Sequence, residues 1–381
     1  SVDNTNVISA KNIGDNSSCN TNYVGSYIGN PVHARTGNKY ETSIDYTSPT
    51  FEFTRRYNSK LNKLDRQIGT QWRHSYSSRL ALNPSATPPI TFSERPDGKI
   101  IHFRFSGGLW VGDGDISDKL TEISGNGWQL TTSDDTIEAY DTSGKLLSII
   151  DRNDRTQTLT YDTYGRLSAV TDDTGRALNF TYDGFSRIQT MTDPGNGVYQ
   201  YAYDTNGNLT SVIYPDAKTR TYHYNESAYT SNTNLPNALT GITDENGNRY
   251  ATYTYDTQGR AIITEHAGGV ERYALIYSTN GNSTIVTDPL NSQYTHNFQT
   301  ILGVAKSTGQ SQPAGSGCSA ASSAMTYDAN GNVASRADFN GNKTCYAYDL
   351  NRNLEIARVE GLSSGNACPG DLIGYTPAAN S

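Results

Sequence analysis

Short runs of apolar and aromatic residues alternate with polar clusters along the chain, and many of these runs end in a Tyr-Asp pair. The pairs stand at Tyr140-Asp141, Tyr161-Asp162, Tyr182-Asp183, Tyr203-Asp204, Tyr255-Asp256, Tyr327-Asp328 and Tyr348-Asp349. Three altered copies keep the spacing, which is 21 residues over most of the series: Tyr224-Asn225, Tyr277-Ser278 and Phe298-Gln299. A fixed period of this length is the sequence signature of a repeat architecture.

The copy that begins at Tyr161 shows what a single repeat predicts. Residues 162–165 read DTYG and form a turn, because Asp caps its own backbone and Gly accepts a positive φ. A strand follows at 167–171, a second turn at 172–175 and a second strand at 177–182. Each repeat therefore predicts two strands and two turns, which is a β-meander, and recurring Asn-Gly pairs at the turns favour tight hairpins.

Each Tyr-Asp pair, or altered copy of it, is called a tag here. The strand that leads into each tag has one consistent inner face. The residue two positions before the tag tyrosine is large, as at Leu159, Phe180 and Tyr201. A period of two places that residue on the same side as the tag tyrosine. On the outgoing strand Leu167 and Val170 are three apart, which predicts a bulge or a switch of face. No segment shows a sustained helical period, so we expect almost no helix.

The distribution of tags divides the chain into three regions. Residues 1–110 have no tag but enough aromatic residues for a core, so we expect an N-terminal β region that caps the spiral. Residues 111–361 are expected to form the repeat strip, with insertions at 227–239 and 310–323. Residues 362–381 are expected to form a C-terminal tail. The predicted fold is all-β: a spiralling antiparallel sheet of repeated hairpins, as a strip or partial shell.

The amino-acid composition predicts a partly polar interior, and it argues against nucleic acid as a partner. Only 34% of the residues are apolar, and the 27 tyrosines outnumber phenylalanine and tryptophan together. A tyrosine ring can be buried while its hydroxyl keeps a polar partner. The net charge of −8 disfavours binding to phosphates, which needs clustered Lys and Arg. No stretch is long and apolar enough to span a bilayer.

The four cysteines are Cys19, Cys318, Cys345 and Cys368, and they allow three pairings that the sequence does not distinguish. No CxxC spacing is present, so disulfides of an exported protein are favoured over a zinc site. We expect a disulfide among Cys318, Cys345 and Cys368 that attaches the tail or the second insertion to the last repeats. Pairing between molecules stays open. A first residue other than Met agrees with a processed N-terminus or an artificial boundary, and the expected location is extracellular or the cell surface.

Motifs for catalysis or for cofactor binding are missing from the sequence. No GxSxG elbow, P-loop or GxGxxG occurs. The histidines lack close ligand spacing: His33, His74, His102, His223, His266 and His296. The turn DTNGN at Asp204 resembles a calcium loop but lacks the ligand positions of an EF-hand, which favours a hairpin turn and leaves weak calcium binding open. We expect no enzymatic activity, no cofactor and no metal site.

Four segments resemble the RHS/YD-repeat family of bacterial secreted proteins. Residues 161–172 follow the pattern YDxxGRLxxVTD, and residues 29–59, GNPVHARTGNKYETSIDYTSPTFEFTRRYNS, resemble the module that opens the RHS core. Residues 96–98 and 128–130 resemble the strands that lead into the first repeats. The resemblance implies a β-strip that spirals into a hollow shell, which in several members encloses a C-terminal toxin released by aspartate-based self-cleavage. This chain has no such cleavage motif and about ten repeats, fewer than closed shells contain.

Three functions without catalysis are compatible with these features. The first is a structural shell or wrapping segment, which could enclose a cargo. The second is a self-assembling extracellular filament subunit, because a repeat strip has sheet ends whose unpaired edges invite strand addition. The third is a cell-surface adhesin that binds glycans, and its signature would be a cluster of exposed aromatic residues on loops.

Overall fold

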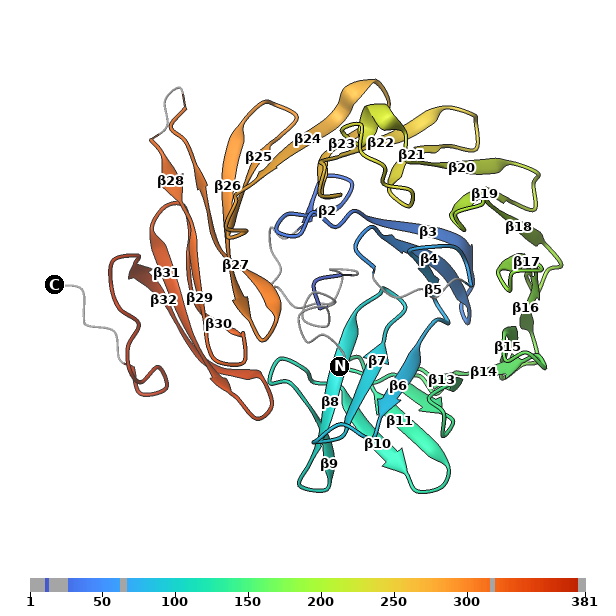
Figure 1. Ribbon diagram of the computed structural model, residues 1–381. Helices are drawn as coiled ribbons and strands as arrows, with labels where there is room; N and C mark the ends of the chain where they lie inside the picture. Colours follow the sequence, from blue (N-terminus) through green and yellow to red (C-terminus); the bar gives the residue numbers. More distant parts are fainter. Residues whose placement is uncertain (1–10, 14–26, 62–66, 316–318, 376–381) are drawn as a thin grey trace.

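The computed structural model describes residues 11–13, 27–61, 67–315 and 319–375. Within these ranges the protein is all-β, with two one-turn 3-10 segments, Ser227–Tyr229 and Ala267–Gly269, and no α-helix. No helix in the described part of the chain is long and apolar enough to cross a membrane. The strands run around a ring whose centre is occupied by the N-terminal part of the chain (Figure 1).

The strands of the N-terminal part are β1 (Tyr27–Ile28), β2 (Val32–His33), β3 (Tyr40–Thr47), β4 (Glu52–Asn58), β5 (Trp72–His74), β6 (Arg79–Asn83), β7 (Ile90–Glu94), β8 (Ile100–Ser106) and β9 (Leu109–Gly112). Those leading into and forming the first repeats are β10 (Lys119–Ile123), β11 (Gly127–Thr131), β12 (Ile137–Tyr140), β13 (Leu146–Ile150), β14 (Thr156–Tyr161), β15 (Leu167–Asp172), β16 (Ala177–Tyr182), β17 (Ile188–Thr192), β18 (Val198–Tyr203), β19 (Leu209–Ile213) and β20 (Thr219–Tyr224).

The remaining strands are β21 (Leu239–Thr243), β22 (Arg249–Tyr255), β23 (Ala261–His266), β24 (Val270–Tyr277), β25 (Ser283–Thr287), β26 (Gln293–Ile301), β27 (Val304–Gln312), β28 (Ala321–Ser322), β29 (Ala324–Tyr327), β30 (Val333–Ala337), β31 (Asn342–Asp349) and β32 (Leu354–Ser363). From β6 to β28 each strand pairs antiparallel with the next, which makes one sheet of 23 strands. Strands β29–β32 form a four-stranded sheet and β3–β5 a three-stranded one. The predicted all-β sheet of repeated hairpins is therefore confirmed.

The repeat predicted from the Tyr161 copy forms at the expected positions. Strand β15 covers the predicted strand at 167–171, and β16 matches the one at 177–182. The turn between them begins at Asp172, whose Oδ1 accepts hydrogen bonds from the backbone N–H groups of Thr174 and Arg176, each at 3.0 Å. Gly175 has a φ of +83°, a conformation that glycine adopts without a steric penalty.

A bulge lies on the outgoing strand opposite the tag tyrosine. Next to the tag at Tyr161, Thr160 pairs with Ala169 while Tyr161 itself pairs with Leu167, so Ser168 is the extra residue. The same shift of register occurs beside Tyr140, Tyr182, Tyr203, Tyr224, Tyr255, Tyr327 and Tyr348. The three-residue spacing in the outgoing strand therefore reflects a bulge. Because bulges increase the local twist, their repetition favours a curled sheet.

The tag tyrosine reaches back to the bulge of the preceding repeat. The Tyr203 hydroxyl donates to the carbonyl of Ile188 at 2.7 Å, and the Tyr224 hydroxyl to that of Leu209 at 2.9 Å. Tyr182 and Tyr255 make the equivalent bonds, at 2.8 and 2.7 Å. Each of these four tags thereby provides a partner for a carbonyl beside a bulge, where the regular ladder is interrupted.

The tag aspartate and the basic residue four positions later complete this contact. Asp183 Oδ1 accepts the backbone N–H groups of Phe185 and Arg187, at 2.8 and 2.9 Å, and Oδ2 accepts Arg187 Nε at 2.7 Å. The Arg187 guanidinium lies over the next tag ring, that of Tyr203, 4.5 Å from its centroid. Partial desolvation opposes ionisation, but the hydrogen bonds from Arg187 outweigh it and lower the pKa of Asp183.

The N-terminal region is arranged differently from the end cap that the sequence suggests. Strands β6–β9 belong to the same sheet as the repeats, and the expected boundary at residue 110 falls inside β9. Strands β3–β5 lie inside the ring, against the concave face of the repeat strands (Figure 1). The physical reason is that their aromatic residues, Phe53, Tyr57 and Trp72, pack into the same core as the inner faces of the repeats.

We expect Tyr203→Phe to lower the free energy of unfolding by about 1 kcal/mol, since it leaves the buried carbonyl of Ile188 without its hydroxyl donor. Tyr164→Phe is the matched control, because that ring lies in a turn and is 81% exposed. Urea denaturation of both variants measures the difference. Equal midpoints for Tyr203→Phe and the wild type would show that the hydroxyl contact does not stabilise the sheet.

Candidate functional site: the filled interior of the shell

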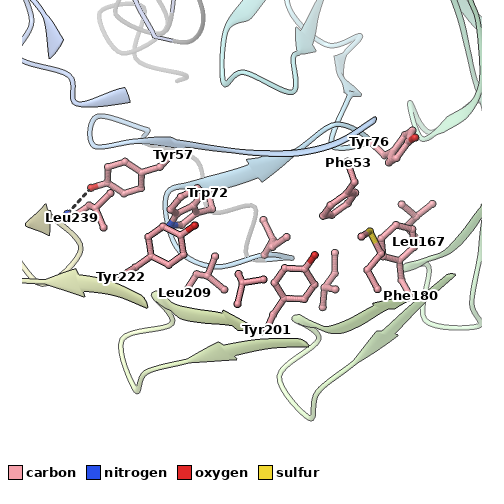
Figure 2. Packing of buried hydrophobic residues seen from close by; sticks show 14 of the residues in the cluster. Phe53, Tyr57, Trp72, Tyr76, Leu167, Phe180, Tyr201, Leu209, Tyr222 and Leu239 are labelled. Atoms are coloured by element: carbon pink, nitrogen blue, oxygen red, sulfur yellow. Dashed lines mark hydrogen bonds between the residues drawn. The ribbon is translucent and has the colours of Figure 1, made fainter. Parts of the chain in front are cut away.

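The concave face of the repeat sheet packs against the inner strands β3–β5. Phe53, Tyr57 and Trp72 point toward Phe180, Tyr201, Leu209 and Tyr222 on the repeat strands (Figure 2). Phe53 lies 5.5 Å from Phe180 and Trp72 lies 5.1 Å from Tyr222, measured between ring centroids. All of these side chains belong to one continuous buried cluster. The interior at this level is therefore a packed core.

A fully buried ion pair lies in this core. Arg55 on β4 binds Asp45 on β3 through two hydrogen bonds, of 2.7 Å from Nε and 2.8 Å from Nη2. Neither side chain is exposed. Burial disfavours the charged guanidinium, yet the Asp45 carboxylate beside it raises the pKa of Arg55 well above its ordinary value. The guanidinium is thus held charged and paired in the interior.

Two tyrosines of the repeat sheet complete the coordination of this ion pair. The Tyr201 hydroxyl donates to Asp45 Oδ2 at 2.9 Å, and Arg55 Nη1 donates to the Tyr222 hydroxyl at 2.9 Å. Burial, followed by the Asp45 charge, raises the pKa of Tyr201 well above 10. The pair therefore binds the inner strands to two neighbouring repeats, because each of its ions makes a further hydrogen bond with a tyrosine of the shell.

Two further networks join other parts of the interior in the same way. Arg95 binds Glu138 on β12 at 2.6 and 2.9 Å, and Glu138 also accepts the hydroxyl of Tyr140, the first tag. Lys39 binds Glu41 at 2.8 Å, and Glu41 accepts the hydroxyl of Tyr253 at 3.0 Å. Each network pairs opposite charges with a tyrosine, an arrangement that orients the strands that carry these residues.

A short N-terminal segment bridges the first hairpins and the later repeats. Lys11 Nζ donates to Asp113 at 2.6 Å, to Asp115 at 3.1 Å and to the carbonyl of Leu302 at 2.9 Å. The lysine side chain is only 7% exposed. One buried cation thus binds the loop after β9 and the turn between β26 and β27, which lie far apart in the sequence.

Neutral hydrogen bonds continue this seam. Asn12 Nδ2 donates to the carbonyl of Gly303 at 3.0 Å, and Asn12 Oδ1 accepts the N–H of Ala305 at 2.7 Å. Asn353 Nδ2 donates to the carbonyl of Gly114 at 2.7 Å. The last repeats therefore contact the loop that precedes the first ones, and the ring closes through side-chain contacts of this kind.

The predicted site residues separate into two groups. The tag tyrosines and aspartates occupy the hairpin contacts described above, and Cys345 and Cys368 form a disulfide with a Cα–Cα distance of 5.8 Å. This disulfide attaches the tail after β32 to strand β31. Cys318 and Cys19 lie outside the described residues. Among the described residues, no group of three or more His, Cys, Asp or Glu side chains could hold a metal ion.

The sequence motifs do not single out the residues that join the inner strands to the shell. Arg55, Asp45 and Lys11 have no repeat spacing, and their partners lie more than 100 residues away in several cases. Arg187 and its equivalents left a clearer signal, because a basic residue stands four positions after many tag aspartates. That regularity could have indicated a contact between successive repeats.

Two family models match parts of this chain, and several solved structures resemble it distantly. Residues 29–103 match a family described as a domain of unknown function, DUF6531, and residues 128–237 match the Teneurin YD-shell family. A crystal structure of TcdB2-TccC3 aligns with 88% of this chain at 12% identity and a TM-score of 0.34. The Photorhabdus luminescens Tc holotoxin pore aligns with 88% at 12% identity and a TM-score of 0.33.

This chain covers 20% and 19% of those two chains, so it spans about a fifth of their length. The comparison with curated proteins finds no match.

Two buried histidines should make the protein less stable in mild acid. Burial lowers the pKa of His33 from 6.5 to about 4 and that of His74 from 6.5 to about 3. In each case Nδ1 accepts a backbone N–H, from Thr36 or Tyr76, which requires the neutral ring. Because the folded pKa values lie below the unfolded ones, the unfolded chain binds protons first. Stability is complete above pH 6.5 and is lost as the pH falls toward these values.

We expect the free energy of unfolding to fall by up to about 1.4 kcal/mol per histidine for each pH unit below 6.5. Urea denaturation between pH 7 and pH 5 measures this slope. The variant His33→Asn/His74→Asn keeps an acceptor near each Nδ1 position without a titrating ring, and its slope should be shallower. Parallel slopes for the variant and the wild type would exclude these histidines as the cause.

Proposed function

We propose that this chain, which carries a YD-shell segment of the RHS/YD-repeat family, is a non-catalytic structural scaffold. In this proposal the repeat sheet wraps around strands β3–β5 of its own N-terminal region, and these strands occupy the space that a separate cargo would otherwise fill. The observation that carries the proposal is the Arg55–Asp45 pair, whose remaining partners are Tyr201 and Tyr222 of the shell.

Buried charge explains why this association would be permanent. Separating the inner strands from the shell would remove two tyrosine hydroxyls from an ion pair that is 0% exposed. Leaving buried charges incompletely paired is strongly destabilising. A cargo has to be released at some stage, whereas a scaffold needs an interior that stays in place. The contacts of Arg55 favour the second role.

A location outside the cytoplasm is the second part of the proposal. The disulfide between Cys345 and Cys368 supports it, because such bonds persist in oxidising compartments and are rare in the reducing cytosol. We infer an extracellular or cell-surface scaffold, in which the disulfide keeps the tail attached to the last repeats.

Replacing Arg55 tests whether the inner strands and the shell form one unit. Arg55→Met should lower the free energy of unfolding by about 3–5 kcal/mol, because it leaves Asp45 buried without its partner. Arg358→Met is the matched control, since Arg358 is half exposed and pairs with Glu355 on the surface, where little change in the free energy of unfolding is expected. Differential scanning calorimetry should give a single, shifted transition for Arg55→Met.

A separate early transition in Arg55→Met, with the main transition at its wild-type temperature, would contradict this role. It would mean that the inner strands unfold while the repeat sheet remains intact. The interior could then be emptied, and a shell with exchangeable contents would be the better description.

A second candidate function is assembly through strand β32. This ten-residue strand pairs with β31, and no described strand pairs with its other edge. Leu354 and Ile356 on it are 54% and 49% exposed. By contrast, β6, the first strand of the 23-stranded sheet, is contacted by a hairpin turn, through the N–H of Leu80 and the carbonyl of Gly144 at 2.8 Å. An open edge of this kind invites addition of another strand.

Sedimentation velocity at increasing protein concentration tests the assembly candidate. The wild type should form dimers or larger species, and Leu354→Lys/Ile356→Lys should remain monomeric, because lysines on an edge oppose strand addition. A wild type that is monomeric at every concentration would remove this candidate and leave the scaffold role unaffected.

A further inference from the structure

Two aromatic rings stand on the turns of neighbouring repeats, outside the interior core. Tyr164 lies in the turn between β14 and β15, and Phe185 lies in the turn between β16 and β17. The four strands are consecutive in the large sheet, and their hairpins are neighbours in the lower right part of the ring in Figure 1. Each ring is 81% exposed, so both belong to the surface that solvent reaches.

Both rings occupy the same position in their turns, two residues after the tag aspartate. In the other turns that begin with a tag aspartate, this position holds a polar residue: Ser143, Asn206, Gln258, Asn330 or Asn351. The turn forms without a ring, because the backbone N–H of Asn206 makes the same 2.9 Å hydrogen bond to its tag aspartate as that of Tyr164. The fold therefore does not account for two adjacent rings here, which indicates a role in contact with a partner.

An arginine of the same turn holds each ring in place. The Arg166 guanidinium lies over Tyr164 and over the next tag ring, Tyr182, at 4.8 and 4.6 Å from their centroids. Arg187 lies over Phe185 in the same way, at 4.9 Å. Since each ring is covered on one face and is still 81% exposed, its other face is open to solvent. Rings that are already positioned lose little conformational freedom when a partner binds.

The charges beside the rings favour a neutral partner. Arg166 Nη2 lies 2.7 Å from Asp162 Oδ2, and Arg187 Nη2 lies 2.7 Å from Asp183 Oδ2. The positive and negative charges of each turn therefore cancel, and neither an anionic nor a cationic partner gains a strong ion pair from them. Contact with these turns depends mainly on the open ring faces.

The spacing of the rings sets the length of the partner. Strand β15 pairs with both β14 and β16, so the two turns lie at the same end of the sheet, two strands apart. Two strand spacings place the turns about 10 Å apart, which is comparable to the length of a disaccharide within an extended glycan. A partner that reaches both rings has to be an extended chain with flat apolar faces at this interval.

We propose that Tyr164 and Phe185 form a two-ring platform that binds an extended, neutral oligosaccharide. The C–H groups on the flat face of a sugar ring carry a small positive charge and pack against the electron-rich face of an aromatic ring. Alternate sugar units stack on the two rings. Ser143 and Asn206, which are exposed at the same position of the turns on either side, extend the row with groups that can bond to sugar hydroxyls.

A proline-rich peptide is the other extended chain with a flat apolar repeat. Such peptides dock into grooves lined by aromatic residues, whereas these two rings protrude from turns. The glycan is therefore the partner that the geometry favours. The platform would attach the scaffold to a glycan surface, and it lies outside the interior on which the scaffold role depends.

A glycan microarray followed by isothermal titration calorimetry tests this platform on the intact chain. The array carries neutral and acidic oligosaccharides from disaccharides to hexasaccharides. The wild type should bind at least one neutral hexasaccharide. The corresponding disaccharide should bind at least about tenfold more weakly, because it reaches one ring at a time.

Replacing the rings links this binding to the platform. Tyr164→Ala and Phe185→Ala should each weaken binding of the hexasaccharide about tenfold, and the double variant should abolish it. Leu290→Ala is the matched control, because it removes an apolar side chain that is 85% exposed and stands two residues after Asp288 in another turn. Its affinity should equal that of the wild type. Thermal midpoints close to the wild-type value verify that each variant is folded.

Three results would overturn the proposal: no binding to any glycan on the array, binding of acidic glycans alone, or equal hexasaccharide affinity in the wild type and the double variant. A proline-rich peptide that binds the wild type but not the double variant, without any response to sugars, would assign the platform to a peptide instead. The scaffold proposal would stand in each case, because it rests on the contacts of Arg55.

Discussion

The structure depends on a hydrogen bond that most tag tyrosines, such as Tyr182, Tyr203 and Tyr224, donate to a carbonyl beside the bulge of the preceding repeat. The bulge bends and twists the sheet, and it also interrupts the ladder, so the carbonyl beside it needs another donor. The Tyr203 hydroxyl supplies that donor to Ile188, while Arg187, oriented by Asp183, covers the tyrosine ring. Curvature and its stabilisation therefore come from the same few residues, and each repeat is stabilised by contact with the next.

A sheet that curls with every repeat acquires a concave face that has to be covered. The inner strands β3–β5 cover it with aromatic rings and with ion pairs whose last hydrogen bonds come from shell tyrosines (Figure 2). The polar composition of the chain is explained by this arrangement, because tyrosine can contribute to a core and also provide a hydroxyl to a buried charge. The interior thus combines close packing with fixed charges, which suits a permanent structural role.

The sequence predicted the elements whose signals are local. The 21-residue period, the strands of the Tyr161 copy and the bulge opposite its tag all follow from spacing within a single repeat. The position of the N-terminal region was not predictable in this way, because contacts such as Arg55 with Tyr222 join residues 167 positions apart. The choice among three disulfide pairings also required the folded position of the tail.

Hydrogen exchange of the intact protein, followed by mass spectrometry, tests most directly whether the shell is built around its own N-terminal strands. The account predicts that amides of β3 and β4 exchange as slowly as those of the repeat strands β16–β20, because both lose protection only when the whole unit unfolds. Fast exchange in β3 and β4, with the repeat strands still protected, would contradict this prediction. It would show that the repeat sheet is stable without the inner strands.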